Sequence, residues 1–305
     1  MKIFEVLRVH SLASALYSAC FGWQTRQVIV AISEGRLGNQ ILQLAGALTA
    51  ARTGERVLLA GFAEIPRNWN HPQAVFILRN LDSHRLTRRF PGLLRGAMGR
   101  LAGWKLITDV NVDHGSRSFT RNNGLLTPLA FVTETFMQIG GLAKPHWVQS
   151  IYEAAREYDE KKLFEGEYFF IHVRRGDFLH WPSSEFPAAL PISWFEEALR
   201  QLRSKAPQNP VIVLSDDTKW ARKQSFLTGT LILELTAVEA WVKMCEAEGG
   251  ILSASSLSFS ASIVSHNRSH RSDLLYAPKY WIGWPQKKWY PISIQSSHLT
   301  YLDVI

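Results

Sequence analysis

Short runs of apolar residues alternate along this chain with longer segments whose apolar positions recur at helical spacing. Each short run ends in glycine, serine, aspartate or arginine, which is typical of a buried strand that leads into a turn. This alternation predicts an α/β protein with largely parallel sheets. The predicted strands are 27–32, 56–60, 168–173, 210–214 and 250–252, and the predicted helices are 41–52, 145–160, 192–205, 218–225 and 236–247.

The predicted elements fall into two groups. The first group reads strand, glycine turn, helix and strand, which is a βαβ unit. Residues 68–141 mix proline, arginine and tryptophan, and we expect loops and short helices there. These groups predict an N-terminal extension over 1–26, a first α/β domain over 27–160 and a second α/β domain over 161–305.

Composition and charge narrow the class of protein. The chain has 305 residues, of which 46% are hydrophobic and 20% charged, which excludes the disordered and fibrous classes. A net charge of +8 suits a nucleic acid, an anionic membrane or a phosphorylated substrate. The basic residues are spread along the chain without a long Lys/Arg block, which argues against a nucleic-acid partner.

The N-terminal segment and the cysteines carry weaker signals. Residues 11–23 are moderately apolar but too short and interrupted for a transmembrane helix, and they lack the pattern of a signal peptide. We expect an amphipathic helix there that touches a membrane surface, with a helix that merely extends the N-terminus as the alternative. Cys20 and Cys245 lie far apart outside any metal-binding spacing, so two reduced thiols are expected, with a single disulfide as the alternative.

The predicted strand at 168–173 ends directly in Arg174 and Arg175. In open α/β sheets, ligands bind at the carboxyl ends of the strands. Two adjacent guanidinium groups repel each other, which favours an anionic partner, and the planar fork of arginine matches phosphate. The alternative is a surface turn in which both arginines are bonded to a local carboxylate.

Two further strand ends carry complementary chemistry. Asp216 and Asp217 follow one strand, and a serine-rich segment over 253–258 follows another and opens a helix. Hydroxyl groups at a helix N-terminus form an anion site. If the three strands are neighbours, the set matches a nucleoside diphosphate, with arginine and serine on the phosphates and aspartate on the base or ribose. The alternatives are a simple helix N-cap for the aspartates and a polar loop for the serines.

Two common nucleotide motifs do not occur. The spacing Gly35-x-x-Gly38 is not the dinucleotide fingerprint GxGxxG, and there is no GKS/T phosphate loop. His172, which precedes the arginines, is typical of a strand histidine that is hydrogen-bonded nearby.

Four segments in order resemble the motifs of the α-1,2-fucosyltransferases, glycosyltransferase family 11. Residues 35–43 resemble GGLGNQxxQ, residues 172–177 resemble HxRRxD, residues 215–220 resemble SDDxxW, and residues 253–260 are similar to ANSSFSWW. Any one of these motifs alone would be unspecific, whereas four in the family's order are specific.

The resemblance implies an α/β fold of the GT-B type, with two Rossmann-like doubly wound domains facing a cleft. It implies a GDP-fucose donor held mainly by the second domain, a galactose-containing oligosaccharide as acceptor, inversion at the anomeric carbon of fucose, and no required metal. From the charge pattern we expect no nucleic-acid partner, and the N-terminal segment and the basic surface favour peripheral membrane contact.

The resemblance also implies site residues. Arg174 would bind the β-phosphate and stabilise GDP as it leaves, and Asp177 would act beside it in catalysis, with His180 and Glu185 as alternative bases. The donor-binding set is His172, Arg174, Arg175, Asp216, Asp217, Ser256 and Ser258, and the first-domain edge of the cleft is Gly35, Gly38, Asn39 and Gln40.

The chain departs from the family pattern at Arg36, Ala254, Leu257 and the pair Phe259-Ser260. These departures keep two alternatives open: a relative that uses another nucleotide sugar or acceptor, and a non-catalytic protein that binds nucleotide or glycan. The expected location is the bacterial cytoplasm or the inner face of its membrane, with the lumenal side of a Golgi membrane as the alternative.

Overall fold

The structure is a computed structural model that describes residues 27–77, 90–134, 140–157 and 166–305. The predicted membrane-touching helix and Cys20 lie outside the described residues. The chain forms two compact units. The first contains Ala47–Ala63 and Asn70–Thr135 together with the segment up to Glu34, and the second contains Gly35–Gly46, Glu64–Trp69 and Phe136–Ile305.

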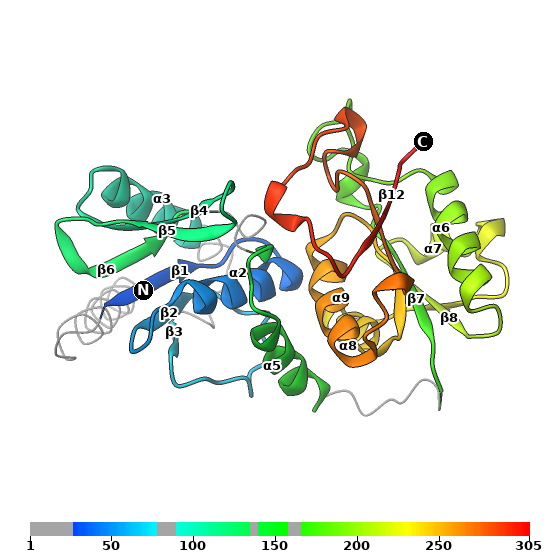
Figure 1. The fold of residues 1–305 in the computed structure, drawn as a ribbon, viewed down its shortest axis with the longest axis horizontal. Helices are drawn as coiled ribbons and strands as arrows, with labels where there is room; N and C mark the ends of the chain where they lie inside the picture. The colour runs from blue at the N-terminus through cyan, green and yellow to red at the C-terminus, as the bar shows by residue number, and fades with distance from the viewer. Residues whose placement is uncertain (1–26, 78–89, 135–139, 158–165) are drawn as a thin grey trace, which may run out of the picture. The chain divides into compact units, whose positions relative to one another are not determined.

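The first unit is built on a six-stranded sheet in the order β3-β2-β1-β6-β4-β5. Every neighbouring pair is parallel except β4 and β5. Helix α3 (Phe90–Gly103) covers one face of this sheet, where Met98 and Ala102 pack on the strands (Figure 1). The strands are β1 (Val28–Ile32), β2 (Arg56–Ala60), β3 (Ala74–Ile77), β4 (Ile107–Asp113), β5 (Ser118–Asn122) and β6 (Leu126–Val132).

A buried ion pair joins Arg121 in β5 to Glu55, the residue before β2. Arg121 of β5 donates two hydrogen bonds of 2.6 Å to the two carboxylate oxygens of Glu55, and both side chains are less than 10% exposed. The terminal nitrogens of Arg121 also bond Gln27 and the carbonyl of Ala50, so each of them makes two hydrogen bonds.

The second unit is built on a six-stranded sheet in the order β12-β11-β10-β7-β8-β9, with every neighbouring pair parallel. Its central strand β7 is fully buried, which explains why its residues are apolar except for His172. The strands are β7 (Phe169–Val173), β8 (Val211–Ser215), β9 (Leu231–Leu233), β10 (Gly249–Ile251), β11 (Leu275–Pro278) and β12 (Thr300–Leu302).

Helices cover both faces of the second sheet, as in a doubly wound fold. Figure 1 shows α6 (Ile192–Lys205) and α7 (Thr218–Ala221) on one side of β7 and β8, and α8 (Ala237–Glu246) and α9 (Ser256–Ser269) on the other. Phe169, Ile171 and Val173 pack against α6, so the alternating residues of β7 face α8 and α9. Helix α5 (Pro145–Arg156) packs on α8 and α9.

The predicted fold class is confirmed: the chain has two parallel-dominated α/β sheets of Rossmann-like order, which is the make-up of a GT-B protein. The predicted division between residues 160 and 161 lies outside the described residues and stays a prediction. No helix among the residues described here is long and apolar enough to cross a membrane.

The prediction of loops and short helices over 68–141 was wrong. This stretch contains β3, α3, β4, β5 and β6. Helix α3 carries four glycines, which lower its intrinsic helix propensity, and it is stabilised by packing on the sheet. Strand β4 alternates buried positions with Asp109 and Asn111, whose polar side chains resemble a loop.

Two predicted helices have different bounds. Helix α2 (Leu37–Ala50) begins four residues earlier than predicted because the Glu64 carboxylate accepts a hydrogen bond of 2.8 Å from the Leu37 backbone N–H at its N-terminus. Helix α7 ends at Ala221, earlier than predicted. Cys245 is buried in α8 as a free thiol, and burial raises its pKa.

Candidate functional site

The strand order of the second sheet brings the three predicted strand ends together. Strand β7 lies between β8 and β10, and all three run parallel. The chain proceeds outward from β7 through β8 to β9 and then returns to place β10 on the opposite side of β7. The ends of β7 and β10 therefore flank the switch point of the sheet, where ligands bind in open α/β folds.

Arg174 lies at this switch point and is held from several sides. Its backbone N–H donates to the Ser253 hydroxyl at 2.9 Å, which ties the end of β7 to the loop after β10. Its guanidinium lies 3.1 Å from a carboxylate oxygen of Asp216 and 2.7 Å from one of Asp177. The side chain is 19% exposed, so the guanidinium is oriented while part of it remains accessible.

Arg175 takes a different direction. Its guanidinium carbon lies 4.1 Å from the ring centroid of Trp220 in α7, a cation–π contact on the face of the sheet opposite to α9. Its Nε atom is buried and has no hydrogen-bond partner. The predicted repulsion between adjacent guanidinium groups is relieved because successive residues at a strand end point to opposite faces. Trp220 supports Arg175, and the sequence indicated it only as part of the SDDxxW segment.

Asp216 and Asp217 are both occupied by contacts within the protein. One carboxylate oxygen of Asp216 accepts the Arg175 backbone N–H at 2.8 Å, and the other pairs with Arg174. Asp217 is the N-cap of α7, where its side chain accepts a bond of 2.9 Å from the backbone N–H of Trp220. The N-cap alternative is therefore present at Asp217, while Asp216 orients the arginine motif.

The lack of a side chain at Gly176 leaves room for the Asp216 carboxylate beside Arg174. A β-carbon added to Gly176 would lie 2.6 Å from a carboxylate oxygen of Asp216, so a larger residue would push that carboxylate away from Arg174.

The serine segment forms the start of α9. Ser255 is the N-cap, and its hydroxyl accepts from the backbone N–H of Leu257. The hydroxyl of Ser256 donates to the side-chain oxygen of Asn39. Ser258 is fully buried, and its hydroxyl lies 3.2 Å from the carbonyls of Ser253 and Ser255, so it supports the loop from beneath. Ser255 is buried as well, and Ser256 is half-buried at this helix N-terminus.

His172 lies in the buried part of β7 and is only 6% exposed. Burial and the nearby positive charge of Arg174 lower its pKa to about 3, so the imidazole is neutral at physiological pH. Its Nδ1 atom is buried without a hydrogen-bond partner. A neutral imidazole beneath Arg174 leaves the positive charge of this edge to the arginine and the helix terminus.

The glycine-rich segment at the start of α2 lies against the start of α9 within the second unit. Gly35 has a positive φ of 72°, and a β-carbon on Gly38 would clash with the Leu257 backbone. Gln40 is buried, and its side chain bonds the Gly35 carbonyl and the Glu64 backbone N–H. The predicted residues Gly35, Gly38 and Asn39 thus lie near Ser256, with Gln40 as their internal support.

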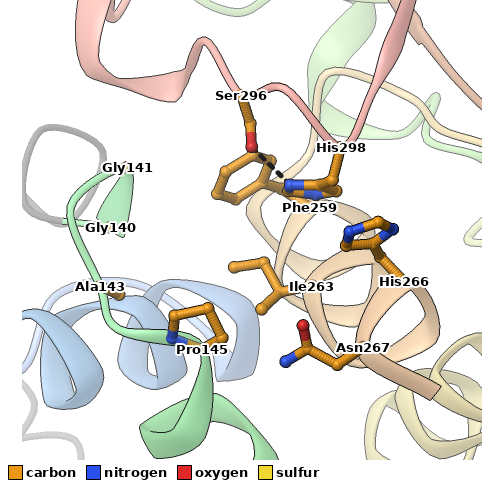
Figure 2. Close-up of a pocket in the computed structure, with 10 residues that line it drawn as sticks. All are labelled: Gly140, Gly141, Ala143, Pro145, Phe259, Ile263, His266, Asn267, Ser296 and His298. Carbon is orange, nitrogen blue, oxygen red and sulfur yellow. Dashed lines mark hydrogen bonds between the residues drawn. The ribbon is translucent and has the colours of Figure 1, made fainter. Parts of the chain in front are cut away.

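A separate pocket of about 90 Å³ lies along α9. Figure 2 shows the His266 and His298 rings beside it, and these rings stack with centroids 5.5 Å apart. Burial lowers the pKa of both imidazoles, to about 3 for His298. The lining contains neither Lys nor Arg, so the strand ends that carry Arg174 suit a diphosphate better than this pocket does. The pocket is lined by Gly140, Gly141, Ala143, Pro145, Phe259, Ile263, His266, Asn267, Ser296 and His298.

Comparison with known proteins agrees with this geometry. Residues 150–271 match the model of Glycosyl transferase family 11. A segment of 52 residues is 40% identical to the O-antigen biosynthesis glycosyltransferase WbnK of Escherichia coli. That segment spans 17% of this chain and 17% of WbnK.

Solved glycosyltransferases resemble the chain at low sequence identity. The E. coli heptosyltransferase WaaC with ADP is 13% identical, with 84% of this chain and 87% of that one covered and a TM-score of 0.43. A mutant of Arabidopsis thaliana FUT1 in complex with GDP is 14% identical, with 84% and 72% covered and a TM-score of 0.43. The glycosyl transferase family 9 protein of Veillonella parvula is 9% identical, with 92% and 86% covered and a TM-score of 0.43.

The family match includes the arginine motif, the aspartate pair and the start of α9, which are the three strand ends that meet at the switch point. Residues 150–271, which carry the three strand ends that meet at the switch point, therefore match a glycosyl transferase family 11 domain.

Proposed function

We propose that this protein transfers L-fucose from GDP-fucose to a hydroxyl group of a galactoside and forms an α-1,2 linkage. The observation that carries the proposal is the position of Arg174 beside the N-terminus of α9 at the switch point of the second sheet. A guanidinium fork and a helix N-terminus both bind phosphate, so this edge suits a diphosphate.

The same groups suit the departure of GDP. When the bond between the sugar and the β-phosphate breaks, negative charge grows on that phosphate. Arg174, already oriented by Asp216, would neutralise this charge together with the N–H groups at the start of α9. A preoriented cation stabilises the transition state without a costly rearrangement.

Inversion requires the acceptor oxygen to attack the anomeric carbon on the face opposite to GDP. The C–O bond to the acceptor forms as the bond to the phosphate breaks, and the hydroxyl proton passes to a base. Asp177 is our first assignment because its side chain is 61% exposed and lies 2.7 Å from Arg174. His180 and Glu185, both exposed, are the alternatives.

The guanine contact is assigned to Asp216, with Asp217 as the alternative. The carboxylate of Asp216 is paired with Arg174, and Asp217 caps α7. To hydrogen-bond the guanine, either carboxylate would have to make that contact in addition to the one that it already makes within the protein. For Asp217 this leaves one carboxylate oxygen, because only Oδ1 accepts from Trp220.

The second candidate is a relative that uses another nucleotide sugar. It is favoured by the departures from the family pattern within residues 253–260. Phe259 packs edge-on against Trp281 with centroids 5.7 Å apart, and the Ser260 hydroxyl accepts from the Trp241 indole N–H at 3.0 Å. Both side chains are buried and point into the second unit. These departures therefore change the packing around α9 while Arg174 and Ser255 are retained.

Calorimetric titration of GDP into the purified protein tests the donor site, with ADP and UDP as controls. EDTA is present throughout, because we expect binding without a metal. Arg174→Ala should weaken GDP binding by about 10- to 100-fold, as expected for the loss of a charge-assisted bond. Arg174→Lys should recover part of this loss, because lysine restores the charge without the fork.

Arg200→Ala is the matched control, because Arg200 is an exposed arginine of α6 that pairs with Glu197. It should bind GDP as the wild type does. Failure of well-folded wild type to bind GDP would reject the fucosyltransferase proposal, and selective binding of UDP or ADP would favour the second candidate. A screen of galactosides with GDP-fucose then tests the acceptor and the α-1,2 linkage.

A further inference from the structure

The loop that follows the arginine motif is closed on itself by backbone hydrogen bonds. The N–H of Ala188 donates to the carbonyl of Trp181 at 2.8 Å, and the N–H of Ala189 donates to the carbonyl of Phe178 at 3.1 Å. Ala188 and Leu190 are buried and anchor the returning arm of the loop. The loop therefore presents its outer side chains in a fixed arrangement.

Two aromatic rings are displayed on this loop. Phe178 and Trp181 are stacked, with centroids 5.4 Å apart and planes at 30°. The guanidinium carbon of Arg174 lies 5.6 Å from the Phe178 centroid. Two consecutive contacts thus lead from the phosphate-binding arginine to the indole of Trp181.

Trp181 is 36% exposed and does not belong to the hydrophobic core that β7 and α6 share. Single exposed aromatics are common on protein surfaces. This one differs because it is stacked next to the candidate reaction centre, in a loop that also carries the exposed polar residues His180, Ser184 and Glu185. An aromatic face with hydrogen-bonding groups at its edge is a surface that suits a sugar.

We propose that Phe178 and Trp181 form a platform that binds the galactose ring of the acceptor, an inference that rests on the proposed function. In β-galactosides the axial 4-hydroxyl leaves the C–H groups at positions 3, 4 and 5 on one face of the ring. These C–H groups carry partial positive charge and pack on the negative face of an indole. The ring hydroxyls on the other edge remain free to bond the polar residues of the loop and to react.

The platform is assigned to the acceptor because the diphosphate of the donor is expected to bind other groups. The diphosphate of the donor is drawn to Arg174 and the start of α9, which are joined by the hydrogen bond from the Arg174 backbone N–H to the Ser253 hydroxyl. Phe178 lies against the same guanidinium from the loop after β7. A sugar on Trp181 would therefore be next to the leaving group without occupying the phosphate position.

Titration of lactose into protein saturated with GDP, followed by saturation-transfer NMR, tests the platform. Trp181→Ala should weaken lactose binding roughly tenfold, the loss expected for one aromatic stacking partner. Trp181→Phe keeps an aromatic face and should recover most of the affinity. The GDP dissociation constant, measured in the same samples, should stay within about twofold of wild type because Arg174 is unchanged.

Trp104→Ala is the matched control, because Trp104 is a 69% exposed tryptophan of the first unit. It should leave lactose binding unchanged. Maltose, whose terminal 4-hydroxyl is equatorial, should bind more weakly than lactose. The platform is rejected if Trp181→Ala binds lactose as tightly as wild type, or if GDP-bound wild type binds no lactose. Absence of GDP binding by wild type is a separate result that overturns the proposed function and this inference with it.

Discussion

Gly38 approaches the backbone of Leu257 so closely that a β-carbon on Gly38 would lie 2.4 Å from the Leu257 nitrogen. The same β-carbon would lie 2.6 Å from the Leu257 α-carbon. Both neighbours are backbone atoms in the first turn of α9, so no side-chain rotation can relieve the clash. A glycine at this position lets the starts of α2 and α9 meet within the second unit.

Gly38→Ala should destabilise the second unit by about 1–3 kcal/mol, the usual cost of overpacking. It should also weaken GDP binding, because the first turn of α9 must shift. Thermal or denaturant unfolding and GDP titration of the variant measure the two effects.

Gly96→Ala is the control for Gly38→Ala. Gly96 lies in α3, and a β-carbon there would meet no atom within 4 Å. Alanine has the higher helix propensity, so this variant should be neutral or up to about 1 kcal/mol more stable. Equal stability of the two alanine variants would contradict the importance of the contact between Gly38 and Leu257.

Trp220→Ala should lower both stability and GDP affinity although Trp220 contacts no predicted ligand. The substitution removes the ring under Arg175 and packing against the core of the second sheet, with an expected cost of about 2–4 kcal/mol. Trp220→Phe keeps a ring face and should lose less. Unfolding and GDP titration provide the measurements. An unchanged affinity in the folded alanine variant would show that the contact between Arg175 and Trp220 does not support the donor site.

Asp217→Ala should cost about 0.5–2 kcal/mol through loss of the N-cap of α7, whereas Asp217→Asn should be nearly neutral because asparagine caps as well as aspartate. Chemical denaturation gives the two stabilities. GDP titration of the asparagine variant then separates capping from base reading. A large loss of GDP affinity at unchanged stability would show that Asp217 contacts the donor.

Acidification should destabilise the protein through His172. Its pKa is about 3 in the folded protein and about 6.5 when exposed, so protons bind the unfolded state first. The stabilising contribution of neutral His172 is complete above about pH 6.5 and is lost as the pH falls toward 3, with a slope of up to about 1.4 kcal/mol per pH unit.

His298 has a pKa of about 3 and acts in the same direction. The unfolding free energy measured between pH 7 and 4.5 should therefore fall less steeply in His172→Gln than in wild type, and still less steeply in a double variant that also carries His298→Gln. An identical pH dependence in all three proteins would show that folding lowers the pKa of neither imidazole.

The local sequence determined the strands and the chemistry at their ends. The apolar runs of β7 and β8 are fully buried strands, and each is followed at once by its polar residues, Arg174 and Asp216. Burial on both faces of a parallel sheet makes such strands visible in the sequence, because apolar residues dominate them. The capping role open to Asp217 could also be predicted, since capping depends only on neighbours along the chain.

The tertiary structure decided which groups meet. The place of β7 between β8 and β10 depends on pairings across many residues, which no local pattern records. The stacking of Arg175 on Trp220 and the burial of Ser258 follow from the direction in which each side chain leaves the strand or helix. Helix α3, rich in glycine, and strand β4, rich in polar residues, form because packing on a sheet outweighs intrinsic propensity.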